Sequence, residues 1–159
     1  LQAASRAGHR VFYITNRACA PLPSIDDPCP AKTATRKNLQ RLGLPDADYP
    51  DALMLRGSHP EWRTSDKTSR RAWVASRYRV IALFGDDLND FMPRADYAKR
   101  RTEFADFFGR RWFLLPNPIY GSWERALLGG VCTPSMTAAQ CAIVTTERRY
   151  GLLETEGQP

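Results

Sequence analysis

Short apolar runs alternate along the chain with segments whose apolar residues recur at helical spacing. Four continuous runs, at residues 11–14, 53–55, 80–84 and 112–115, have the length of strands that are buried on both faces. The segments around them predict helices at residues 1–8, 32–42, 66–77, 97–108, 123–128 and 138–150. This alternation predicts an α/β fold, a Rossmann-like parallel sheet with helices on both faces.

Composition narrows the class of protein. With 159 residues, of which 43% are hydrophobic and 25% charged, the chain fits a single globular domain over residues 1–150, followed by a frayed tail at 151–159. These proportions exclude a disordered chain and a coiled coil. The longest uncharged run, residues 126–146, contains glycine, proline and several hydroxyl side chains, and it is too polar to span a bilayer.

The charge balance favours an anionic partner. Lys and Arg outnumber Asp and Glu by 23 to 17, a net charge of +6 that attracts phosphorylated molecules, nucleic acid or anionic membranes. Paired arginines with nearby aromatics suit a phosphate backbone, but they are scattered among helices: Arg70-Arg71, Arg100-Arg101, Arg110-Arg111 and Arg148-Arg149. We therefore expect these pairs to be solvated surface, and the partner to be a small phosphorylated substrate rather than a specific nucleic acid. A protein that binds nucleic acid without sequence specificity is the remaining alternative.

Four cysteines fall into two local pairs, Cys19 with Cys29 and Cys132 with Cys141. Their spacings lack the short knuckle of structural zinc sites. Four thiols allow three pairings, and the sequence does not select one. Prolines around the first pair favour a loop stapled by a disulfide, and free buried thiols are the alternative. Disulfides would indicate an oxidising compartment, the periplasm or the exterior.

The ends of the predicted strands hold the candidate chemistry. Parallel α/β sheets bind ligands beyond the carboxyl ends of their strands. The polar residues that follow the strands or begin the next helix are Thr15, Asn16, Arg17, Arg56, Lys67, Asp86, Asp87 and Asn117. We therefore expect a hydroxyl group, an ammonium group and several carboxylates to meet at one edge of the sheet.

The turn after the third predicted strand suggests a metal site. Asp86, Asp87 and Asp90 place three carboxylates within five residues. Carboxylates this close repel one another unless a hard cation binds them, and Mg²⁺ accepts sparse carboxylate ligation completed by water and substrate phosphate. The alternative is an aspartate-rich turn whose side chains satisfy the free N–H groups of a helix.

Four motifs occur in an order that matches a known family. They are Ile-Thr-Asn-Arg at 14–17, Asp-Lys-Thr-Ser-Arg-Arg at 66–71, Gly-Asp-Asp-Leu-Asn-Asp-Phe at 85–91 and Leu-Pro-Asn-Pro-Ile-Tyr-Gly-Ser-Trp-Glu at 115–124. Over about residues 1–128 the chain resembles the secreted acid phosphatases of the haloacid dehalogenase (HAD) superfamily, subfamily IIIB or class C, which includes the outer-membrane lipoprotein e(P4). The resemblance implies a HAD-like fold and Mg²⁺-dependent hydrolysis of phosphomonoesters, often 5′-nucleotides, through an aspartyl-phosphate. It also implies a periplasmic or secreted location, with an outer-membrane lipoprotein as one form.

On the substrate side, the resemblance implies roles for Thr15, Lys67 and Tyr120. Thr15 matches the phosphate-binding threonine. From the residues themselves, we expect the Thr15 hydroxyl to donate to a phosphoryl oxygen with help from the backbone amides of Asn16 and Arg17. Lys67 matches the lysine that stabilises charge on the phosphoryl group. Tyr120 resembles an aromatic residue that stacks on the base of the substrate, and a buried structural tyrosine is the alternative.

On the metal side, the resemblance implies roles for the three aspartates of the turn. Asp86 matches the carboxylate that ligates Mg²⁺, and Asp90 matches the nearby acidic residue that supports this carboxylate. We therefore count Asp90 among the candidate catalytic residues. Asp87 stands where e(P4)-like members carry asparagine, and it adds a negative charge beside the metal. We therefore expect Asp86 and Asp87 to face the metal.

The first motif of the family, Asp-x-Asp-x-Thr after an apolar strand, supplies the nucleophile and is missing here. No acidic residue occurs before residue 11, and Asp46-Ala47-Asp48 follows Gly-Leu-Pro rather than a strand, which excludes it. We therefore expect an N-terminally truncated chain, inactive alone, that lacks the central strand of the sheet. The flanking strands should then leave a gap or pair directly. The alternative is natural loss of the motif in a non-catalytic phosphate- or nucleotide-binding relative. The sequence leaves open whether the chain forms a homodimer.

Overall fold

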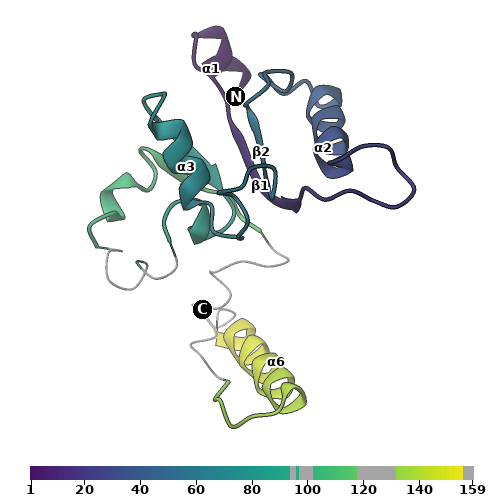
Figure 1. Ribbon diagram of the computed structural model, residues 1–159. Coiled ribbons are helices and arrows are strands. Elements are labelled where there is room, and N and C mark those ends of the chain that lie inside the picture. Colours follow the sequence, from purple (N-terminus) through teal and green to yellow (C-terminus); the bar gives the residue numbers. More distant parts are fainter. Residues whose placement is uncertain (94–95, 97–101, 118–131, 156–159) are drawn as a thin grey trace. The chain divides into compact units, whose positions relative to one another are not determined.

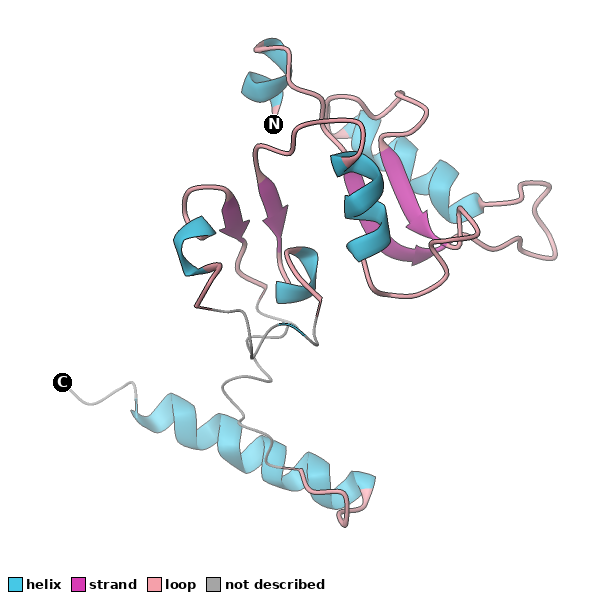
Figure 2. Ribbon diagram, turned by 60° about the vertical axis from the view of Figure 1, so that its left-hand side comes forward, coloured by secondary structure: helices cyan, strands magenta, loops and turns pink. Residues whose placement is uncertain are grey.

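The computed structural model describes residues 1–93, 96, 102–117 and 132–155, and parallel strands with helices confirm the α/β fold class (Figure 1). Contacts divide the chain into two compact units, Leu1–Ala82 with Met92–Arg101 and Leu83–Phe91 with Thr102–Pro159. The four strands of the described residues form two separate parallel pairs, β1 with β2 in the first unit and β3 with β4 in the second (Figure 2). The single domain expected over residues 1–150 stays a prediction.

The first unit is built around a fully buried strand. In β2 (Leu53–Arg56), the residues Leu53, Met54 and Leu55 are at most 1% exposed, as expected of an apolar run that is covered on both faces. Its parallel partner is β1 (Tyr13–Ala18). Helices α2 (Pro30–Arg41) and α3 (Thr68–Ala75) lie on opposite sides of this strand pair (Figures 1 and 2). The apolar pattern of β2 therefore determines where the core lies.

A small apolar cluster in the first unit ties α3 to β2. Met54, Trp62 and Val74 are buried together, with partly buried aromatic and aliphatic side chains around them. The surrounding residues are Phe12, Ile14, Trp73 and Tyr78. Burial of one side chain of this size contributes about 1.5–3 kcal/mol, so the cluster holds α3 in place.

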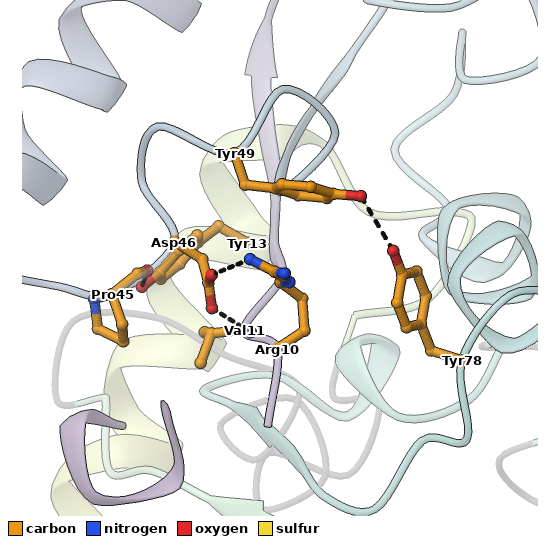
Figure 3. A network of polar contacts seen from close by, with 7 residues as sticks. All are labelled: Arg10, Val11, Tyr13, Pro45, Asp46, Tyr49 and Tyr78. Atoms are coloured by element: carbon orange, nitrogen blue, oxygen red, sulfur yellow. Dashed lines mark hydrogen bonds and ion pairs between the residues drawn. The ribbon is translucent and has the colours of Figure 1, made fainter. Parts of the chain in front are cut away.

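A polar network fixes the amino-terminal end of β1 (Figure 3). The network comprises Arg10, Val11, Tyr13, Pro45, Asp46, Tyr49 and Tyr78. At its centre, the Asp46 carboxylate accepts hydrogen bonds from the Val11 N–H at 2.8 Å and from the Arg10 guanidinium at 2.6 Å. Asp46 has a φ of 59°, a left-handed conformation that aspartate tolerates better than most residues. Because Asp46 precedes β2, the structure agrees with the exclusion of Asp46-Ala47-Asp48 as the nucleophile motif.

The second unit contains a short strand pair and an aromatic cluster. Strand β3 (Leu83–Gly85) pairs in parallel with β4 (Trp112–Leu114). Rings of four phenylalanines lie between 5.0 and 5.5 Å from the ring of Trp112: Phe91, Phe104, Phe107 and Phe108. The unit also contains the 3₁₀ helices η1 (Leu88–Asp90) and η2 (Ala105–Phe107) and the helix α6 (Ala138–Thr155). Aromatic rings therefore pack around Trp112, at the start of β4.

Two strands differ from their predicted bounds by more than one residue at an end. Strand β1 runs to Ala18, so the segment at 15–17 lies within the strand and not after it, as had been expected. Strand β3 covers only 83–85 instead of 80–84, because its pairing with β4 is limited to three positions. Within the ranges that the structure describes, β1 and β3 belong to different pairs, so the direct pairing expected as one consequence of a missing central strand is not found.

The helices also differ from expectation at their ends. Helix α1 (Gln2–Arg6) ends before Gly8, as predicted. Helix α2 begins at Pro30, two residues earlier than predicted, because proline suits the first helical turn. Helix α6 continues to Thr155, into the segment 151–159 that had been expected to fray. The predicted helix at 97–108 begins outside the described residues and ends in η2, and the one at 123–128 lies outside them entirely.

Both local cysteine pairs form disulfides, Cys19–Cys29 and Cys132–Cys141. The fold therefore selects one of the three pairings that the sequence allowed. The first disulfide connects the end of β1 to the start of α2. Among the described helices, none combines the length and the apolar character that crossing a bilayer requires.

Candidate functional site

Thr15 lies at an irregularity near the carboxyl end of β1. Thr15 pairs with Leu55 of β2, and the register then jumps to Ala18 opposite Arg56, which leaves residues 16 and 17 outside the regular ladder. The N–H of Arg17 donates to the Thr15 hydroxyl at 3.3 Å. Irregularities of this kind redirect side chains and are common beside active sites. The arrangement keeps the half-buried Thr15 hydroxyl at the edge where ligands of parallel sheets bind.

A buried arginine connects this strand end to the start of α3. Arg70 is 0% exposed, and it donates to the Thr15 carbonyl oxygen and the Asn16 Oδ1, each at 2.7 Å. It also donates to the carbonyl oxygens of Asp66 at 3.0 Å and Thr64 at 3.3 Å. The expectation that the arginine pairs are solvated surface is therefore wrong for Arg70, because its guanidinium meets acceptors from separate segments.

Sequence reasoning missed Arg70, although the sequence contains a signal for it. Residues four apart lie on the same face of a helix, and Arg70 is four residues before the core residue Val74. An arginine in phase with a buried valine therefore points toward the strands. The neighbouring Arg71 is out of phase, and its guanidinium donates to the Thr68 hydroxyl at 3.1 Å.

Lys67 lies immediately before α3, as the sequence predicted. The adjacent Asp66 accepts a hydrogen bond from the Thr68 N–H at 2.6 Å and so supports the first turn of the helix. Burial, the largest single influence, raises the pKa of Asp66, but hydrogen bonds from Thr68 and the positive charges of Arg71 and Arg70 together bring this pKa below its ordinary value. Asp66 is therefore an anion beside Lys67 at neutral pH.

Asp86 and Asn117 meet at the carboxyl ends of the second strand pair. Asp86 directly follows β3, and Asn117 lies three residues beyond β4. The Asn117 side-chain amide donates to the Asp86 Oδ2 at 2.6 Å. The structure thus brings together two of the strand-end residues that the sequence singled out, and Asn117 fixes the orientation of the Asp86 carboxylate.

Asp90 and Asp87 use carboxylate oxygens to hold the turn itself. The Asp90 Oδ2 accepts hydrogen bonds from the N–H groups of Asp86 at 3.1 Å and Asp87 at 3.2 Å. The Asp87 Oδ1 accepts from the Asn89 N–H at 2.9 Å and from the Asn89 side chain. A Cβ on Gly85 would lie 2.4 Å from the Cβ and the Oδ2 of Asp90, so the turn requires glycine at this position. The capping role weighed for the turn thus describes Asp87 and Asp90 well.

The acidic turn fits a magnesium ion that is bound through few protein ligands. Within the described ranges, no three His, Cys, Asp or Glu side chains are placed to hold a metal by themselves. Mg²⁺ needs only one or two carboxylates, because water and substrate phosphate complete its shell. The half-buried Asp86 carboxylate, oriented by Asn117, fits such a ligand. The expected roles of Asp87 as a ligand and of Asp90 in catalysis stay predictions.

The predicted site residues fall into two groups. The segment from Thr15 to Arg17 and the start of α3 with Lys67 belong to the first unit, where Arg70 links them. Asp86, Asp87 and Asp90 belong to the second unit, together with Asn117. The expectation that both groups surround one phosphate stays a prediction. Tyr120, the predicted contact to the base, lies outside the described residues.

A surface cavity of about 630 Å³ lies elsewhere in the first unit. It is lined by Arg10, Asp46 and Tyr49 among others. These residues precede the strands β1 and β2, so the cavity is at the amino-terminal ends of the pair. Because parallel sheets bind ligands at the opposite ends of their strands, we do not assign the phosphate to this cavity.

Comparison with known proteins identifies the family of the chain. Two solved structures are similar to the chain: the class C acid phosphatase from Bacillus anthracis, and a class C acid phosphatase from that organism with tungstate bound. Each shows 27% sequence identity and a TM-score of 0.65, and the match covers 95% of this chain but only 57% of the solved chain. A family model of the HAD superfamily, subfamily IIIB (acid phosphatase), matches residues 1–123. The chain therefore belongs to subfamily IIIB of the HAD superfamily, the acid phosphatases.

Proposed function

We propose that the chain forms the phosphate- and metal-binding part of a Mg²⁺-dependent phosphomonoesterase that acts on small phosphorylated molecules, including 5′-nucleotides. The observation that carries the proposal is the Asp86 carboxylate at the end of β3, held at 2.6 Å by Asn117. Membership of an acid phosphatase subfamily supports it. So does the tungstate bound to a similar class C enzyme, because tungstate is an oxyanion like phosphate.

Each polar group of the site has a distinct task in this proposal. The Thr15 hydroxyl donates a hydrogen bond to a phosphoryl oxygen, with help from the backbone around Asn16 and Arg17. The Lys67 ammonium neutralises charge that develops on the phosphoryl group. Asp86, with Asp87 as a second carboxylate, would hold the magnesium ion, and the positive charge of the metal would neutralise the phosphoryl oxygens.

Two further residues fix the geometry of the acidic turn before substrate binds. Asp90 holds the backbone amides of the turn, and Asn117 keeps the Asp86 carboxylate in one orientation. Groups that are fixed before substrate binds need no rearrangement during the reaction. A turn organised in this way therefore suits a site for a charged transition state.

The nucleophile belongs to sequence outside these 159 residues in our proposal. The family's reaction proceeds by attack of an aspartate to give an aspartyl-phosphate, and this sequence contains no Asp-x-Asp-x-Thr motif. The chain spans 57% of the length of the solved chains that it matches. We accordingly expect residues 1–159 alone to release no phosphate.

The proposal also places the protein in an oxidising compartment, the periplasm or the exterior of the cell. The two disulfides support it, because such bonds persist mainly outside the cytosol. Mass spectrometry of the native protein under non-reducing conditions tests this directly. Four free thiols in protein taken from its natural compartment would contradict it.

The enzymatic part is tested by phosphate release from p-nitrophenyl phosphate and from a nucleoside 5′-monophosphate. The assay uses protein that includes the sequence upstream of residue 1, called the extended protein below. Activity is measured with Mg²⁺ and again after EDTA treatment. We expect Mg²⁺-dependent release that Asp86→Asn abolishes and Lys67→Met strongly reduces. Asp106→Asn, which changes an exposed carboxylate of the same unit, is the matched control and should retain activity.

The missing motif gives a second candidate function, a non-catalytic relative that binds phosphate or nucleotide. In that case the extended protein releases no phosphate, yet calorimetry detects nucleotide binding that Lys67→Met weakens. Release of phosphate by the extended protein excludes this second candidate.

A further inference from the structure

Arg70 is a fully buried cation that joins the two segments carrying the proposed phosphate-binding groups. One terminal nitrogen donates to the Thr15 carbonyl oxygen at 2.7 Å. The other donates to the Asn16 Oδ1 at 2.7 Å and to the Asp66 carbonyl oxygen at 3.0 Å. Thr15 carries the proposed phosphate-binding hydroxyl, and Asp66 directly precedes Lys67. A single side chain therefore holds the backbone at both positions.

The shape of this side chain makes the connection rigid. A guanidinium is planar, and its N–H groups point in fixed directions, so it fixes the separation of the acceptors that it binds. Thr15 and Asp66 are more than 50 residues apart in the sequence, as the Arg70–Thr15 bond itself spans 55 positions. Thr15 also lies where the ladder between β1 and β2 loses its regular register. Pairing with β2 therefore defines the position of this strand end less well than the rest of β1.

We propose that Arg70 is a positioning residue, which sets the separation between the Thr15 hydroxyl and the Lys67 ammonium to match a phosphoryl group. The inference rests on the proposed function, since it assigns a cause to the geometry of that phosphate site. Arg70 does not bind the phosphate itself. It is 0% exposed, and its terminal nitrogens are directed at acceptors of the protein.

The test compares Arg70→Lys with Arg77→Lys in the extended protein. Lysine keeps the positive charge but replaces the planar fork by a single ammonium group, which cannot hold all of these acceptors at fixed separation. Arg77 is an exposed arginine just beyond α3, so Arg77→Lys is the same chemical change away from the site. We expect kcat/KM for p-nitrophenyl phosphate to fall about 100-fold in Arg70→Lys, the size of effect that a small misplacement of reacting groups produces. Arg77→Lys should stay within about 3-fold of wild type, as expected of an exposed position.

Inhibition by inorganic phosphate separates positioning from general stability. A purely structural role would lower the fraction of folded protein, measured by circular dichroism, but would leave the inhibition constant of the folded enzyme unchanged. We expect this constant to rise together with KM in Arg70→Lys. Folded Arg70→Lys enzyme with the KM, kcat and phosphate inhibition constant of Arg77→Lys would overturn the inference.

A second variant keeps the test decisive if Arg70→Lys does not fold. Asn16→Ala removes one acceptor of Arg70 from an exposed residue, and Asn38→Ala on α2 is its exposed control. We expect Asn16→Ala, but not Asn38→Ala, to weaken phosphate inhibition. If the wild-type enzyme is active, an unchanged inhibition constant for phosphate in Asn16→Ala would overturn the inference. Wild-type protein that neither releases nor binds phosphate would instead overturn the proposed function, and this inference with it.

Discussion

The substitution Gly85→Ala tests how the acidic turn is built. A Cβ at this position would lie 2.4 Å from both the Cβ and the Oδ2 of Asp90, far inside ordinary contact distance. Gly85 is not among the glycines with positive φ, so alanine fits the backbone and only the contact is unfavourable. Because the Asp90 Cβ is bonded directly to the Asp90 backbone, rotation of the side chain cannot relieve this contact. The turn must therefore shift by about 1 Å, as overpacked sites do.

The structure sets the expected cost of this shift. Asp90 accepts hydrogen bonds from the N–H groups of Asp86 and Asp87 at 3.1 and 3.2 Å, already near the upper limit of good geometry. A displacement of this size breaks at least one of them, at about 1.5–3 kcal/mol for a bond to a charged acceptor. Overpacking adds about 1–3 kcal/mol, and the two contributions overlap. We therefore expect Gly85→Ala to lower the free energy of unfolding by about 2–4 kcal/mol.

Amide hydrogen exchange measured by NMR gives the local assay, and thermal unfolding followed by circular dichroism gives the global one. Faster exchange at the N–H groups of Asp86 and Asp87 is the expected signature of Gly85→Ala. Gly109→Ala is the control in the same unit, because Gly109 has a φ of 77° but no atom within 4 Å of its Cβ position. It should cost about 1–2 kcal/mol through backbone strain and leave those two amides unchanged. Wild-type exchange at both amides in Gly85→Ala would refute the steric argument.

Two more predictions concern the first unit. Asp46→Ala removes the acceptor of the Val11 N–H and places alanine in a left-handed conformation, so we expect urea unfolding to show a free energy of unfolding lower by about 2–4 kcal/mol. Asparagine tolerates the left-handed conformation, so Asp46→Asn should lower the free energy of unfolding by less than half as much. Equal losses in both variants would contradict this account. Hydrogen bonds from the Thr33 hydroxyl and then from the Cys29 N–H lower the pKa of the Asp27 carboxyl. The Asp27 carboxylate therefore stabilises the fold above the ordinary aspartate pKa of 3.8, and this stabilisation is lost as the pH falls through the lower pKa of the folded state. Asp27→Asn should therefore destabilise the chain at pH 7 and reduce the loss of stability below about pH 4, and acid titrations of the two proteins that superimpose would count against it.

Much of the candidate site followed from strand-end residues, because a parallel sheet gathers its chemistry at one edge whatever the details of packing. Asp86 and Asn117 illustrate this, since the sequence placed both at strand ends and the structure joins them by a hydrogen bond. Thr15 was predicted to follow its strand and instead lies within it, because the pairing with β2 continues past residue 14. Local pattern identifies a strand, but hydrogen bonding to its partner decides where the strand ends.

The sequence by itself determined the α/β class, the buried run at 53–55, the acidic turn and the order of four family motifs, because each of these depends on neighbouring residues. Only the tertiary structure decided which cysteines pair, how the carboxylates of Asp87 and Asp90 are used, and that Arg70 is buried. The burial of Arg70 depends on acceptors up to 55 positions away in the chain. The disulfides and the hydrogen bonds of the turn join nearby residues, but the choice among their possible partners depends on the folded backbone. A charged side chain such as Arg70 is buried only where distant segments supply enough acceptors to replace its water, and no local pattern records that supply.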